Sequence, residues 1–122
     1  MNDKKYIARI ENNLGKLFYE FDNIEEAFVH YKKAKKIRIE EDDLGLLETL
    51  GNICENYIKL KDVDNAKATL EEIMNYIESG DNTELIKYYI LKYRVDILEN
   101  NINEAERTLL IARDYAKNME CF

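Results

Sequence analysis

One short phrase returns in this sequence at a fixed interval, and it constrains the fold more than any other feature. An Asp- or Asn-rich stretch ending in alanine reads DNIEEA, DVDNA and NNINEA, at residues 22–27, 62–66 and 100–105. The closing alanines are Ala27, Ala66 and Ala105, so the same interval occurs twice. A period of about 39 residues is typical of stacked units, because one unit cannot bury its apolar face alone. We expect each alanine to be buried where two helices cross closely.

The pattern within each unit is helical. The chain has no proline and only four glycines, which leaves few turn signals for a sheet. In six successive segments the apolar residues recur at steps of three and four, as on one face of a helix. These stripes begin at Tyr6, Ile24, Leu46, Val63, Leu85 and Ile102. The sequence therefore predicts an all-α fold of six helices in a single domain, residues 1–122.

Capping residues mark the expected helix starts. Asn23 with Glu26, and Asn101 with Glu104, have the spacing of a capping box. In that motif the first side chain accepts from an orphan amide, and the acid reaches back to the amide of the capping residue. Asp62 can cap the fourth helix in the same way. Near the end of the second unit, Gly80 suits a left-handed helix end, and Asp81 or Asn82 can cap the next helix.

The third unit departs from the period in its first helix. A strict alignment at the repeat period places Lys92 and Asp96 at positions that are apolar in the other units. A shift of one residue restores apolar residues at these positions. They are Tyr88, Leu91, Val95 and Leu98. We therefore expect a one-residue insertion near Glu99.

The units resemble tetratricopeptide repeats (TPR), in which a small residue and an aromatic precede a tight turn, followed by Ala, a bulky residue and Ala. The first unit matches this pattern with Leu14-Gly15, Phe18, Asp22-Asn23, Ala27, Tyr31 and Ala34. The resemblance implies a right-handed α-solenoid of three helix–turn–helix repeats, approximately 3–41, 42–80 and 81–119. The period exceeds the family's usual length of about 34 residues, and we expect second helices about one turn longer. Such long units are similar to the repeat domains of bacterial peptide-sensing regulators.

The net charge and the cysteines limit the classes of partner and the compartment that we expect. The net charge is −7, and residues 43–81 hold almost all of the acid excess, with three basic and nine acidic side chains. An acidic chain of this kind lacks the basic surface that binds a phosphate backbone, so no direct nucleic acid binding is expected. The sequence shows no apolar run of membrane-spanning length and no secretory signal. Cys54 and Cys121 lack metal or redox spacing, which favours a reduced cytoplasmic protein without a metal.

No residue pattern predicts catalysis or a cofactor, and we expect that the protein is not an enzyme. His30 is the only histidine and has no nucleophile or metal partner in the sequence, so a partly packed side chain is expected. Cys54 is expected to be packed and inert, and Cys121 to be an exposed thiol. The basic run from Lys32 to Arg38 is either a solvated face or a docking patch for an acidic partner.

The resemblance places the first helices along a concave groove, and residues there that do not pack are candidates for peptide binding. Asn13 and Asn52 are one repeat period apart, and an amide can hold an extended peptide by its backbone. In the third unit the groove face is apolar and aromatic. The predicted peptide-binding residues are Arg9, Asn12, Asn13, Lys16, Asn52, Glu55, Lys59, Tyr89 and Tyr93.

Three functions remain open on the sequence. The first is a protein- or peptide-binding interaction module that uses the groove. The second is the peptide-sensing domain of a bacterial transcriptional regulator. The third is a self-assembling structural module, with a possible homodimer through the C-terminal helix, where Tyr115, Met119 and Phe122 are expected to be exposed.

Overall fold

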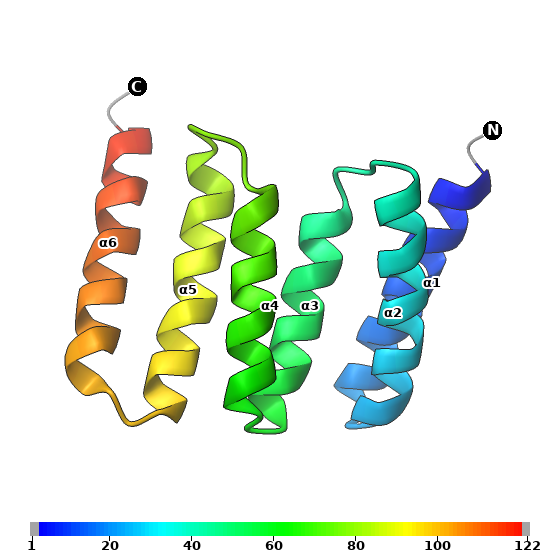
Figure 1. The fold of residues 1–122 in the computed structure, drawn as a ribbon, viewed down its shortest axis with the longest axis horizontal. Coiled ribbons are helices and arrows are strands. Elements are labelled where there is room, and N and C mark those ends of the chain that lie inside the picture. The colour runs from blue at the N-terminus through cyan, green and yellow to red at the C-terminus, as the bar shows by residue number, and fades with distance from the viewer. Residues whose placement is uncertain (1–2, 121–122) are drawn as a thin grey trace. The chain divides into compact units, whose positions relative to one another are not determined.

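The computed structural model describes residues 3–120, and this range forms six α-helices and no strand, as the sequence predicted (Figure 1). The helices are α1 (Asp3–Glu20), α2 (Ile24–Glu40), α3 (Leu46–Lys59), α4 (Val63–Tyr76), α5 (Asn82–Leu98) and α6 (Ile102–Glu120). The predictions for Cys121 and Phe122 fall outside the described residues. Within residues 3–120, none of these helices combines the length and the apolar character needed to cross a membrane.

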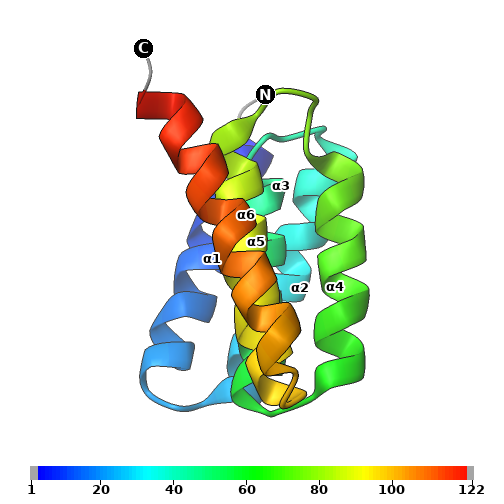
Figure 2. The ribbon, with the colours of Figure 1, turned by 90° about the vertical axis from the view of Figure 1, so that its left-hand side faces the viewer.

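The chain divides into two compact units, Met1–Asn56 and Tyr57–Phe122, and the boundary falls within α3. In the first unit α1 packs along α2, and side chains of α1 and α2 bond to the N-terminal part of α3. In the second unit α5 packs against both α4 and α6, and Figure 2 shows α6 running along α5.

The repeated phrase forms a repeated turn. Asp22, Lys61 and Asn100 each adopt a left-handed backbone conformation, with φ of 61°, 59° and 58°. In each turn the next amide donates to a carbonyl five residues earlier, over 2.8 to 3.0 Å: Asn23 to Phe18, Asp62 to Tyr57, and Asn101 to Asp96. This is the Schellman arrangement that satisfies orphan carbonyls at a helix end. The turns recur at the repeat period, so residues one period apart occupy equivalent positions in the helices.

The residue after each left-handed position caps the following helix. The side-chain oxygens of Asn23, Asp62 and Asn101 each accept from the amide three residues later, and Asp81 does the same at the start of α5. The expected reach-back from the acid is wrong for Asn23 and Asn101, because their own amides already donate to the preceding helix. Gly80 has a positive φ of 85°, but it lies in the loop beyond the end of α4.

Small residues let the helices approach, and this prediction is confirmed. Ala27, Ala66 and Ala105 are all buried, and so is Cys54. Each alanine lies one turn after its N-cap, where a larger side chain would push the paired helices apart.

The expected insertion near Glu99 is wrong. The amide of Asn101 donates to Asp96 just as Asn23 donates to Phe18, so the repeat register runs unbroken through this turn. Asp96 is therefore buried at the position of Phe18, and Lys92 is half-buried four residues before it. Both are accommodated by an ion pair of 3.2 Å between them, rather than by a shift of the helix.

Candidate functional site

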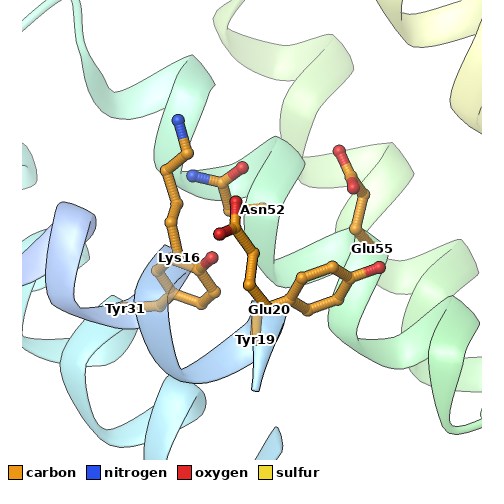
Figure 3. A pocket seen from close by; sticks show the side chains of 6 residues that line it. All are labelled: Lys16, Tyr19, Glu20, Tyr31, Asn52 and Glu55. Carbon is orange, nitrogen blue, oxygen red and sulfur yellow. The ribbon is translucent and has the colours of Figure 1, made fainter. Parts of the chain in front are cut away.

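A hollow of about 270 Å³ opens in the first unit between α1, α2 and α3. Its lining combines two tyrosines, two glutamates, one lysine and one amide, and Figure 3 shows their side chains. They are Lys16, Tyr19 and Glu20 from α1, Tyr31 from α2, and Asn52 and Glu55 from α3. Tyr31 is buried and forms the floor, whereas Lys16 and Glu20 are exposed at the rim.

A buried hydrogen-bond network holds Asn52 in place. Asn12 is at its centre: its Oδ1 accepts from Thr49 Oγ1 at 3.0 Å and from Asn52 Nδ2 at 3.1 Å. The Nδ2 of Asn12 donates to Glu48 Oε1 at 2.7 Å. Arg38 Nη1 extends the network by donating to Thr49 Oγ1 at 2.8 Å. The network joins α1, α2 and α3, so the position of the Asn52 amide is set by three helices.

The floor depends on a glycine. Gly15 lies against the Tyr31 ring so closely that a Cβ at this position would overlap ring atoms of Tyr31. The absence of a side chain at Gly15 therefore lets the Tyr31 ring pack directly against the backbone of α1. Burial raises the pKa of the Tyr31 hydroxyl well above its usual value, and the nearby carboxylate of Glu55 adds to the rise. The hydroxyl is thus a neutral group throughout the physiological pH range, able to donate a hydrogen bond.

The charges of the hollow are mixed and slightly acidic. Lys16 is the one cationic group among the six lining residues, and Glu20 and Glu55 are the two acids. Such a site disfavours a free carboxylate and suits a ligand that carries a positive group beside neutral polar groups.

The structure brings together three of the residues predicted to bind a peptide, Lys16, Asn52 and Glu55. Asn12 was expected on the groove surface; this is wrong, because its side chain is fully buried and engaged by the network. Arg9 and Asn13 are exposed on α1 outside the hollow.

The other predicted residues belong to the second unit. Lys59 is exposed near the end of α3, and Tyr93 is half-buried on α5. Tyr89 stacks on Tyr115 of α6, with ring centroids 5.8 Å apart. Of the expected C-terminal apolar strip, Tyr115 is half-buried and Met119 is exposed.

Sequence reasoning missed the roles of Glu20, Tyr31 and Arg38. Tyr31 has the bulky position of the repeat pattern, and the small residue that the same pattern places in the first helix, Gly15, is the signal that points to their contact. Arg38 was grouped with the exposed basic run, yet it is buried and bonded to Gly45 and Thr49. Of that run, Lys32, Lys33 and Lys36 are exposed.

His30 takes part in a local packing contact. Its ring stacks on Phe18 with centroids 5.3 Å apart, and Nδ1 lies 2.6 Å from Glu11 Oε2. Among residues 3–120 no group of three or more His, Cys, Asp or Glu side chains is arranged to hold a metal ion.

A second hollow, of about 410 Å³, lies within the second unit and is strongly charged. Its centre is Lys92, whose Nζ lies 3.2 Å from both Asp96 Oδ2 and Glu104 Oε1. Burial lowers the pKa of Lys92, but the hydrogen bonds to Glu104 and Asp96 outweigh this and raise it overall. Thr108 Oγ1 donates to Asp96 Oδ2 at 2.8 Å. These charged groups satisfy one another, so the cluster is explained by packing within the unit.

Fold and site together define an all-α protein with a repeated helix–turn–helix architecture and a small polar hollow. Comparison of the chain with family models, with curated proteins and with solved structures gave no match.

Proposed function

We propose that this protein is a peptide-binding module, built as a TPR-like right-handed α-solenoid, and that the hollow of the first unit holds part of an extended peptide. The observation that carries the proposal is the convergence of Lys16, Asn52 and Glu55 with two tyrosines in one hollow. The role is binding rather than catalysis, in a reducing cytoplasm where the buried Cys54 stays a thiol.

Asn52 is the residue we propose to hold the peptide backbone. One hydrogen of its Nδ2 is committed to Asn12, which leaves the second hydrogen and Oδ1 of the amide to pair with a peptide group. The buried network fixes this amide before a ligand arrives, so little side-chain entropy is lost on binding.

The acidic pair sets the proposed preference. Glu20 and Glu55 favour a lysine or arginine side chain of the ligand, and the half-buried Tyr19 ring can cover its aliphatic stem. A dedicated clamp for a C-terminal carboxylate is disfavoured, because Lys16 is outnumbered by the two acids.

The test uses peptides selected from a random displayed library against the wild-type protein, followed by titration calorimetry with variants. Asn52→Ala should weaken the selected peptide by about tenfold, the worth of one or two lost hydrogen bonds. Glu55→Gln should weaken peptides that carry a basic residue and leave neutral peptides unchanged.

Asn13→Ala is the matched control, since Asn13 is an exposed asparagine on α1 outside the hollow. It should bind as wild type does. Equal affinity of the wild type and the Asn52→Ala variant for every selected peptide would show that the hollow is not the binding site.

A further inference from the structure

One face of α1 carries an apolar seam with the spacing of a helix–helix contact. Its residues alternate at steps of three and four along five positions. What we term the α1 seam consists of Ile7, Ile10, Leu14 and Leu17 of α1, and of Phe21 directly after its end. All of them are exposed except the half-buried Leu14. A continuous exposed apolar strip of this kind marks a contact surface.

The repeat register shows what type of surface this is. Four of the seam positions have equivalents within α3, one period later, and all four are buried: Leu46, Thr49, Ile53 and Asn56. The fifth equivalent, Leu60, lies just beyond α3 and is exposed. Thr49 is covered by the preceding hairpin, through its bonds to Asn12 of α1 and Arg38 of α2. In α3, the positions equivalent to the α1 seam are thus the ones that the preceding hairpin covers. In α1 the same positions are open to solvent.

The complementary surface occurs in the second unit. In the first unit, Ala8, Asn12 and Tyr31 are buried residues of the hairpin on which α3 packs. Their equivalents, two periods later, form what we term the α5–α6 face: Ile86, Ile90 and Leu109. Ile90 and Leu109 are exposed, and Ile86 is half-buried. The α5–α6 face thus corresponds, by repeat position, to the surface that covers α3. It too faces solvent.

At the centre of both open surfaces an apolar residue stands where the equivalent position in the first unit is polar. Within the first unit the central contact joins Asn12 to Thr49, and both are 0% exposed. The equivalent contact between the two open surfaces would join Ile90 to Ile10, which are 47% and 58% exposed. A change on one side alone would strand a buried polar group against an apolar one. The paired change from polar to apolar gives a matched contact for these two surfaces of the same sequence.

Charge does not oppose such a contact. Residues 1–42 carry nine positive and nine negative side chains, and residues 82–122 carry six and seven. The acid excess of the chain lies between these segments. Two copies can therefore bring the α1 seam and the α5–α6 face together without strong like-charge repulsion.

We propose that the α5–α6 face of one copy packs on the α1 seam of a second copy, as the α1–α2 hairpin packs on α3 within one chain. The contact is heterologous, since it joins two different surfaces, so each added copy leaves one surface of each kind open. The protein thus assembles head to tail, and the mean mass of the assembly rises with concentration.

The test compares two single variants and their mixture by sedimentation velocity and light scattering over a wide range of concentration. Ile10→Glu blocks the α1 seam and Ile90→Glu blocks the α5–α6 face, because each buries a charge in an apolar contact. Each variant alone should be a monomer at concentrations where the wild type associates. Their equimolar mixture should form a one-to-one dimer and nothing larger, since each variant retains one intact surface.

Val29→Glu is the matched control, because it places the same charge at an exposed apolar position of α2 outside both surfaces. It should associate as the wild type does. Circular dichroism checks that each variant keeps its helices, and Ile10→Ser and Ile90→Ser replace any glutamate variant that does not. A wild type that stays monomeric at every concentration overturns the proposal. So does an Ile90 variant that still self-associates, which would indicate a symmetric seam-to-seam dimer, or a mixture that forms no dimer.

Discussion

The α1–α2 hairpin of the first unit and the α5–α6 hairpin of the second share a turn and a buried alanine, but their interiors differ in chemistry. In the first, Phe18 stacks on His30 with ring centroids 5.3 Å apart. At the equivalent positions of the second, Asp96 accepts a hydrogen bond of 2.8 Å from Thr108. The left-handed turn and the alanine therefore set the backbone, and the interior tolerates either an aromatic pair or a polar pair that is satisfied.

The small and large residues have also exchanged places between these hairpins. Gly15 of α1 lies under the ring of Tyr31, and the equivalents in the second unit are Tyr93 and Leu109. The first arrangement leaves a polar hollow above the tyrosine. The second leaves the exposed leucine of the α5–α6 face. One backbone thus presents a candidate ligand site in one unit and an apolar surface in the other.

The largest expected effect comes from removing the buried carboxylate of the second hairpin. Asp96→Ala should lower the free energy of unfolding by about 2–3 kcal/mol, because Lys92 and Thr108 lose a buried partner. The loss is smaller than for a fully buried ion pair, since Lys92 is part-exposed and keeps Glu104. Urea denaturation followed by circular dichroism measures it.

The double variant Asp96→Leu/Thr108→Val sharpens the comparison, because it replaces the polar pair of the second hairpin by an apolar pair. It should recover part of the stability lost in Asp96→Ala, since Thr108 no longer leaves an unpaired hydroxyl and Lys92 keeps Glu104. If the double variant is no more stable than Asp96→Ala, the two interiors are not interchangeable as we argue.

The second effect concerns the floor of the hollow. Gly15→Ala should cost about 2 kcal/mol, because the added methyl must displace the buried Tyr31 ring. Alanine favours a helix over glycine by roughly 1 kcal/mol, so any net loss of stability must come from the overlap of the methyl with the Tyr31 ring. Tyr93→Ala at the equivalent half-buried position serves as the comparison and should lose stability only through reduced burial. A Gly15→Ala variant as stable as the wild type would contradict the packing of Tyr31 on α1.

These cases show which features of the structure can be predicted from sequence. The six helices, their caps and the buried alanines follow from local spacing, because each depends on residues a few positions apart. The burial of Asn12 and Asp96 could not be predicted in this way. Their partners Thr49 and Thr108 are 37 and 12 residues distant, and only the folded chain shows that they meet. The sequence places Asn52 and Lys16 on first helices by their position in the repeat, and both line the hollow. The floor of the hollow depends on the contact between Gly15 and Tyr31, which are on different helices.

The third prediction is a gain in stability. Asn56 is fully buried, and within residues 3–120 neither its Oδ1 nor its Nδ2 has a hydrogen-bond partner. Its equivalent in α5 is the buried Val95. Asn56→Leu, which has a similar shape, should raise the free energy of unfolding by about 1 kcal/mol. Asn56→Ala is the control and should gain less, because it leaves a cavity. A loss of stability in the leucine variant would mean that this amide holds a bound water or another polar group.

The smallest effect is a dependence of stability on alkaline pH, and it involves one buried tyrosine in each unit. Burial raises the pKa of both Tyr31 and Tyr88 in the folded protein. Since the unfolded tyrosine ionises first, near pH 10, the folded state binds more protons above that pH. The stability contributed by each neutral hydroxyl is therefore complete below about pH 10 and declines as the pH rises further.

Tyr31→Phe should flatten this decline, and its stability relative to the wild type should improve between neutral and strongly alkaline pH. Denaturation midpoints across this range give the slopes, and identical slopes for Tyr31→Phe and the wild type would show that the Tyr31 hydroxyl titrates as it does in water.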